Sequence, residues 1–297
     1  MRRSGFRAGL AAGALGCGGA GARPAPTPVP ADARVWAAAT DETPRGLSDL
    51  AADATGALWA PAERHGGLFR LDPAPGGELR AMEALPWAGE APAEDRESLA
   101  FGPDGTVWLG LEAHADGAAA ESLLRVRAVD GRLVPEARVA LPWAPFGVAG
   151  EDNHGVEALC VIGDTLLAVA ERRLPDGAAP AWQVGPTGDI TALRLPLPDG
   201  RAVPSALACA PDGAGGAHLT LLVRHYGAAA LLRFAWPAGG APTPAGAEDL
   251  TRRWAVPLNL EGLAPAPGGG WLLLTDNDSG GLAGPTRLID WGPTPTP

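Results

Sequence analysis

The sequence predicts an all-β fold built from repeated four-stranded sheets. Gly and Pro, 42 and 31 of the 297 residues, recur along the whole chain, as expected of many short strands joined by turns. A short strand, a Gly turn and a second apolar strand recur five times. Apolar residues alternate or run continuously, and the 3.6-residue spacing of a helical solenoid is missing. We therefore predict a single β-propeller of five four-stranded blades.

The first strands of the five copies define the repeat. Successive copies begin roughly 48 to 60 residues apart, which fits about 40 to 50 residues per blade plus loop insertions. Six blades is the alternative, if the long stretch 172–204 holds a degenerate blade. The first strands begin at Ser48, Glu97, Glu157, Ser205 and Glu261.

The outer strands follow in chain order within each copy. The last copy lacks a fourth strand, which residues 34–38 can supply, and this pairing would join the chain ends and remove an open sheet edge. The expected third and fourth strands are 67–71, 78–85, 122–127, 133–141, 189–195, 229–236, 252–256 and 286–291.

The N-terminal region predicts export. Three Arg precede a short apolar stretch that ends at Gly16 and Cys17, an order typical of a signal peptide and similar to a bacterial lipoprotein cleavage box. We predict a signal peptide at 1–16 with Cys17 lipidated, and a periplasmic, outer-membrane or cell-surface location. A cleaved signal without lipid, or no export, are the alternatives. A Gly/Pro-rich linker at 17–32, a propeller at 33–292 and a Pro/Thr tail at 293–297 complete the division.

The charge of the chain excludes some partners. Removal of residues 1–16 takes away three Arg and changes the formal charge from -11 to about -14, which argues against nucleic acid and anionic lipid. A lipidated Cys17 is the only expected link to a membrane. Cys160 and Cys209 occupy places in the repeat that differ by one residue, hence opposite pleat faces, which favours two separate buried thiols over a disulfide.

The starts of the innermost strands predict an acidic ring. In a propeller these strands begin at the face where the second strands end, so Glu97, Glu157 and Glu261 should meet at the mouth of the channel. Like charges there raise one another's pKa or need a cation between them, unless Arg64, Arg96 or Arg172 pairs with them. Hard oxygen ligands favour Ca²⁺ over zinc. The predicted metal ligands are Glu97, Glu157, Glu261, Asp276 and Asp278.

The ends of the second strands supply basic and imidazole side chains to the same face. A single charged loop tip is ordinarily just solvated, but five tips converge here because of the repeat. No nucleophile elbow, phosphate-binding loop or Cys-Xaa-Xaa-Cys motif is present. The predicted substrate-binding residues are Arg64, His65, His114, Arg172, Arg224 and His225.

Several segments resemble one known family. RGLSDLAAD at 45–53, ERHGGLFRLD at 63–72, HGVEALCVIGDTLLAVAE at 154–171 and NLEGLAPAPGGGWLLLTDND at 259–278 are similar to the bacterial phytase-like propellers described as having esterase-like activity of phytase. The resemblance covers about 45–292. It implies a propeller that hydrolyses an ester or phosphoester, with a divalent cation. The absence of Lys, and Ala62-Glu63-Arg64-His65-Gly66 in place of Ser-Asp-Arg-Gly, argue against phytate itself.

Three functions therefore stay open. In a metal-assisted hydrolase, Ca²⁺ would polarise the substrate, an Arg would stabilise the developing anion, and Glu157 or His154 would be the general base. A non-catalytic surface propeller would use the same face to bind an envelope protein, glycan or cell-wall component. A lactonase of the gluconolactonase type is the third.

Overall fold

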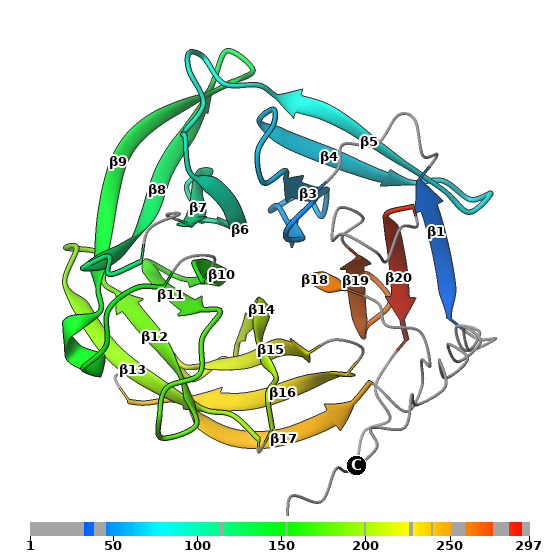
Figure 1. Ribbon diagram of the computed structural model, residues 1–297. Helices are drawn as coiled ribbons and strands as arrows, with labels where there is room; N and C mark the ends of the chain where they lie inside the picture. The colour runs from blue at the N-terminus through cyan, green and yellow to red at the C-terminus, as the bar shows by residue number, and fades with distance from the viewer. Residues whose placement is uncertain are drawn as a thin grey trace, which may run out of the picture.

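The chain forms an all-β protein whose sheets are arranged around a common central axis, as predicted (Figure 1). The region along this axis, where the innermost strands begin, is called the channel. The structure is a computed structural model that describes residues 33–38, 46–112, 116–151, 154–198, 200–225, 228–238, 240–250, 259–275 and 285–292. The expected signal peptide, linker, Cys17 and tail lie outside these residues. Among the described residues, no helix is long and apolar enough to cross a membrane.

Three of the sheets are antiparallel and hold four strands in chain order. The first comprises β6 (Asp95–Phe101), β7 (Thr106–Glu112), β8 (Ala120–Val129) and β9 (Arg132–Pro142). The second comprises β10 (Val156–Ile162), β11 (Thr165–Ala170), β12 (Ala178–Val184) and β13 (Ile190–Pro196). The third comprises β14 (Val203–Pro211), β15 (Ala217–His225), β16 (Ala228–Trp236) and β17 (Thr243–Asp249).

The remaining eight strands form one continuous sheet, in the order β18-β19-β20-β1-β5-β4-β3-β2. Its N-terminal strand pairs antiparallel with the last strand of the chain, from Arg34 opposite Asp290 to Ala37 opposite Arg287. It also pairs parallel with Glu78 and Leu79. The strands are β1 (Arg34–Ala38), β2 (Ala51–Ala52), β3 (Leu58–Pro61), β4 (Leu68–Pro73), β5 (Glu78–Leu85), β18 (Leu260–Pro265), β19 (Trp271–Thr275) and β20 (Arg287–Trp291).

The structure places the long stretch 172–204 and shows one outer strand that differs from the sequence-based expectation. The stretch 172–204, which could have held a further blade, forms β12 and β13 of the second four-stranded sheet. The outermost strand of the third sheet is β17, upstream of the expected strand 252–256, which lies outside the described residues.

The innermost strands β6, β10, β14 and β18 share a β-bulge near their first residue. The pairing register shifts between Arg96 and Ser98 in β6 and between Val156 and Ala158 in β10. It shifts in the same way between Pro204 and Ala206 in β14 and between Leu260 and Gly262 in β18. A bulge leaves one residue unpaired and redirects its side chain. The unpaired residues are Glu97, Glu157, Ser205 and Glu261, all of them among the predicted ring positions.

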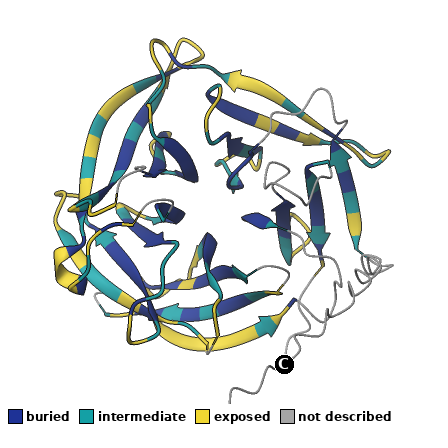
Figure 2. Ribbon diagram, viewed as in Figure 1, coloured by how far each residue is buried: buried dark blue, intermediate teal, exposed yellow. Residues whose placement is uncertain are grey.

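The core lies between neighbouring sheets, which pack face to face. Ala158 and Leu167 of one sheet, for example, join Leu207 and Leu221 of the next in a single buried cluster. Figure 2 shows that the inner strands are mostly buried and that exposure increases toward the outermost strands. This packing holds the first residues of the innermost strands around the channel.

A disulfide joins Cys160 of β10 to Cys209 of β14, with the two Cα atoms 5.9 Å apart. The expectation of two separate thiols was therefore wrong. That expectation assumed that side chains on opposite faces of their strands cannot meet. Because neighbouring sheets pack face to face, opposite faces of two successive sheets are the ones that meet.

Candidate functional site

The acidic ring is present at the centre of the molecule. Glu97, Glu157 and Glu261 lie within the first three residues of β6, β10 and β18 and are buried, with exposed fractions of 7 %, 5 % and 6 %. Burial, followed by the charges of Glu63 and Glu112, raises the pKa of Glu97. Glu261 also contributes to this rise, so the carboxylates act on one another across the channel.

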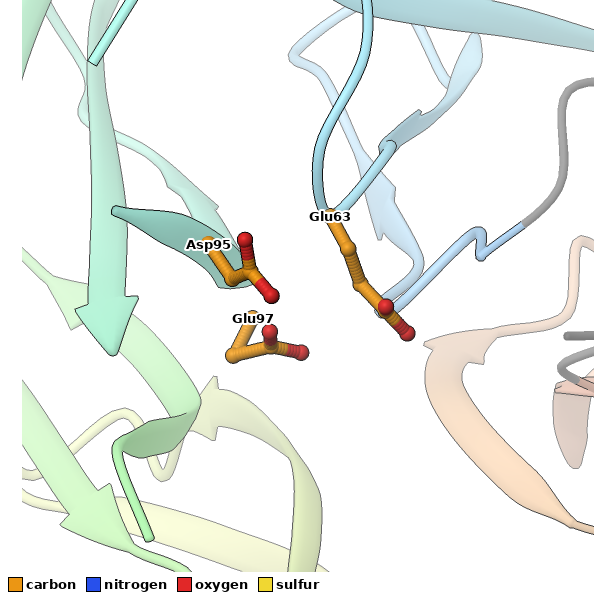
Figure 3. Close-up of side chains that lie close together, drawn as sticks. All are labelled: Glu63, Asp95 and Glu97. Carbon is orange, nitrogen blue, oxygen red and sulfur yellow. The ribbon is translucent and has the colours of Figure 1, made fainter. Parts of the chain in front are cut away.

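One part of the ring forms a compact triad that could hold a metal ion. Carboxylate oxygens of Glu63, Asp95 and Glu97 all lie within 4.8 Å of one another. Figure 3 shows Asp95 and Glu97 extending from the same strand toward Glu63, which follows the end of β3. Residues two apart on a strand extend from the same face, so Asp95 and Glu97 can reach one site. Three hard oxygen donors suit a divalent cation such as Ca²⁺ or Mg²⁺.

Glu63 and Asp95 were not among the residues predicted to bind metal. The sequence contains a signal for both. Glu63 ends a second strand, and Asp95 stands two residues before a ring position. What the repeat could not show is that the end of one blade and the start of the next place these carboxylates together.

A second group of carboxylates already has a cation from the chain. Arg224, at the end of β15, donates to both carboxylate oxygens of Glu261, with Nε at 2.9 Å and Nη2 at 2.7 Å. The same Nη2 lies 3.3 Å from an oxygen of Glu171. Burial alone would lower the pKa of Arg224, but the charges of Glu261 and Glu171 raise it above its usual value. Arg224, predicted to bind substrate, is thus paired within the protein.

Carboxylates of both groups act on Glu157. Among the described residues, its carboxylate has no hydrogen-bond or ion-pair partner. Burial, followed by the charges of Glu171 and Glu97, raises its pKa well above the ordinary value for Glu. A carboxyl group in these surroundings retains its proton to higher pH than usual, which suits it to proton transfer near neutrality.

Ser205 occupies the equivalent bulge in the neighbouring strand β14. It is fully buried, and its Oγ has no hydrogen-bond partner in the described part of the chain. A buried hydroxyl without a partner is unfavourable by about 1 to 3 kcal/mol unless a water or ligand completes it.

The other arginines that were expected to pair with the ring make different contacts. Arg64 Nε lies 3.0 Å from Asp95. Arg96 is fully buried, and its Nε and Nη2 donate to the carbonyl of Ala62 at 3.0 and 2.8 Å. Arg172 pairs with Glu151 at 2.5 Å and lies over the ring of Trp143. None of these guanidiniums pairs with Glu97 or Glu157.

The histidines are only partly placed at the ring. The charge of His154 helps to limit the rise in the pKa of Glu171 that burial causes. His65 is exposed in the turn after β3, and His225 is the last residue of β15. The remaining predicted site residues, His114, Asp276 and Asp278, lie outside the described residues.

A sequence model of one protein family matches residues 42–219, more than half of the chain. Its description is "Phytase-like: Esterase-like activity of phytase". The chain belongs to this phytase-like family. The resemblance seen in the sequence is therefore confirmed, and the family's name implies an esterase-like activity. No curated protein matches the sequence.

Solved structures show the fold of this phytase-like protein. The exo-β-1,3-galactanase of Phanerochaete chrysosporium is 11 % identical, with a TM-score of 0.53, over 86 % of this chain and 62 % of that one. The PQQ-bound aldose sugar dehydrogenase of Streptomyces coelicolor is 16 % identical, with a TM-score of 0.46, over 89 % and 99 % of the two chains. At these identities the likeness to the galactanase supports a β-propeller and says nothing about substrate.

Proposed function

We propose that the protein is a metal-assisted ester hydrolase whose site is the acidic channel, with Ca²⁺ held by Glu63, Asp95 and Glu97. The observation that carries this proposal is the triad of carboxylates within 4.8 Å of one another. The proposal keeps Glu97 from the ligands predicted from the sequence and adds Glu63 and Asp95. Glu261 is no longer a proposed ligand, because it pairs with Arg224.

The triad fits a divalent cation chemically. Its oxygens repel one another, and two guanidiniums offset part of this charge. Arg64 Nε lies 3.0 Å from Asp95, and the buried Arg96 is close enough for the charges of all three carboxylates to act on it. Ca²⁺ takes six to eight oxygen ligands, so three carboxylates leave room for water and a substrate oxygen. When bound, the cation would polarise a substrate carbonyl and lower the pKa of water.

Glu157 is the proposed proton carrier. Its buried carboxyl has no partner in the described residues, and its raised pKa allows it to exchange a proton near neutral pH. His154 acts in this proposal only through Glu171, whose pKa its charge affects. Arg224 holds Glu261 and Glu171 in place and offsets part of their charge, although both carboxylates still raise the pKa of Glu157.

The proposal includes a closed ring of five four-stranded blades. The antiparallel pairing of β1 with β20 supports β1 as the fourth strand of the last blade. Close contact between the first and last blades supports closure, since a Cβ at Gly262 would lie 2.7 Å from the Cβ of Leu50. We also propose that the protein matures outside the cytoplasm, because the Cys160–Cys209 disulfide is typical of oxidising compartments.

Calcium binding by calorimetry tests the function. We expect the full chain to bind one Ca²⁺, and Glu97→Gln to weaken binding about tenfold or more, because one charged ligand is lost. Glu94→Gln is the matched control, since Glu94 pairs with Arg138 outside the triad. The same samples are assayed with carboxylic esters, phosphoesters and lactones. No calcium binding together with no turnover would exclude the metal hydrolase and leave the channel face as a docking surface.

A further inference from the structure

We propose that Arg96 is the positioning residue of the acidic triad. Its buried guanidinium joins the two backbone segments that carry Glu63 and Asp95, and so sets the spacing of the carboxylates that would hold the cation. The inference rests on the proposed function and adds a residue that acts through the ligands rather than on the metal or the substrate.

Arg96 contacts the backbone on both sides of the triad. On one side, its Nε and Nη2 donate to the carbonyl of Ala62 at 3.0 and 2.8 Å, and its backbone amide donates to the carbonyl of Glu63 at 3.1 Å. On the other side, its Nη1 donates to the carbonyls of Pro92 and Glu94 at 3.4 and 3.5 Å. One residue thus joins the segment after β3 to the segment that leads into β6.

These bonds leave the carboxylate oxygens of the triad available to an ion. The Arg96 side chain donates to backbone carbonyls, whereas Arg224 occupies both carboxylate oxygens of Glu261. The charges of the three triad carboxylates still act on Arg96, and they oppose the lowering of its pKa by burial. Arg96 therefore reduces the repulsion within the triad without occupying a ligand atom.

The surroundings of Arg96 hold it in one position. The residue is 1 % exposed, and Ser48 Oγ donates to its backbone carbonyl at 2.5 Å. A planar guanidinium presents its donors as a rigid fork, which the compact ammonium of Lys cannot reproduce. Substitution of residues that orient metal ligands typically lowers metal affinity by about 10- to 100-fold. Loss of the fork should therefore weaken cation binding even when the positive charge is kept.

Calcium calorimetry on the full chain tests this role. Arg96→Lys keeps the charge and removes the fork, and we expect it to weaken Ca²⁺ binding about tenfold or more. Arg173→Lys is the matched control, because Arg173 also donates to backbone carbonyls, those of Gly177 and Pro198 at 2.8 and 2.7 Å. It should leave calcium affinity unchanged. Thermal unfolding of both variants shows that each is folded and compares their stabilities.

Hydrogen exchange of the metal-free protein tests the same role without calcium. In Arg96→Lys, the amides of residues 62–66 and 93–97 should exchange faster than in the unaltered protein, because the link between the two segments is weakened. In Arg173→Lys, the exchange of these two segments should not change.

Unchanged calcium affinity in folded Arg96→Lys, an equal loss of affinity in Arg173→Lys, or unchanged exchange in the two segments would overturn the inference. If the unaltered protein binds no Ca²⁺, the proposed function fails, and hydrogen exchange still decides whether Arg96 holds the segments together. If Arg96→Lys does not fold, Ser48→Ala takes its place, since it removes only the bond to the carbonyl of Arg96. Calcium affinity should then fall by a smaller factor, and an unchanged affinity would contradict the role of Arg96.

Discussion

Two buried serines near the channel differ in a single hydrogen bond. Ser98 Oγ donates to the carbonyl of Val156 at 2.5 Å and so connects β6 to β10. Ser205 Oγ has no partner in the described residues, although both side chains are fully buried. Substitution of each of these two serines therefore separates the stabilising effect of a hydrogen bond from the effect of burial.

We expect Ser98→Ala to lower the free energy of unfolding by about 1 kcal/mol, because a buried hydrogen bond is lost. Ser205→Ala should leave it unchanged or raise it by up to about 1 kcal/mol, since no bond is removed and a buried polar atom disappears. Urea denaturation of the two variants measures both. An equal loss in both would show that an ordered water already completes Ser205.

At the level of elements, contacts of the first two strands of one sheet with the first strand of the next join neighbouring sheets. The amide of Gly155 donates to Glu112 at 2.9 Å, across the boundary between β7 and β10. At Gly110 of β7, a Cβ would lie only 2.4 Å from the carbonyl oxygen of Val156, so this close approach requires glycine. The disulfide between β10 and β14 is the covalent member of this set.

Reduction of the Cys160–Cys209 disulfide should lower the free energy of unfolding by about 2 to 4 kcal/mol, because the bond closes a loop in the unfolded chain. The loop is long, because the two cysteines are 49 positions apart in the sequence. Denaturation with and without dithiothreitol measures the loss. A Cys160→Ala/Cys209→Ala variant is the control and should not respond to the reductant. Equal stability of the oxidised and reduced protein would contradict the prediction.

Over the whole molecule, a minority of the acidic side chains is withdrawn from solvent. The formal net charge is -11, and buried carboxylates line the channel. Burial raises the pKa of Glu157 and of Glu171, and the charge of Glu171 raises that of Glu157 further. Their ionisation therefore acts against folding unless a cation compensates it.

The metal-free protein should be more stable near pH 5 than near pH 8. A carboxyl group whose folded pKa exceeds its unfolded value of about 4.3 binds more protons when folded, so stability falls as pH rises from that value toward the folded pKa. The hydrogen bond from Arg138 lowers the pKa of Glu94. Carboxyl groups with a lowered pKa change the stability at a lower pH than the two values compared. Thermal unfolding in a chelator measures the trend.

Two controls accompany the pH series. Saturating Ca²⁺ should reduce the difference between the two pH values, because the cation favours ionised carboxylates. Glu157→Gln should also reduce it, because one group with a raised pKa no longer titrates. If the metal-free protein is more stable near pH 8 than near pH 5, the channel carboxylates do not control the pH dependence of its stability.

The sequence by itself determined the all-β fold, its repeated sheets and the positions that begin the innermost strands. These follow from the spacing of turns and apolar residues, which is local information repeated along the chain. For the same reason, the sequence placed Glu97, Glu157 and Glu261 on one face, and their mutual effect on pKa follows from that placement.

Only the tertiary structure decided which group each carboxylate meets. The Arg224–Glu261 pair, the Glu63, Asp95 and Glu97 triad and the Cys160–Cys209 bond all join residues of different blades. Such contacts depend on how two sheet faces pack and where a bulge turns a side chain, and neither is encoded in the period of the repeat. The one-residue difference between copies predicted two separate cysteines, but face-to-face packing of the two sheets brings them together.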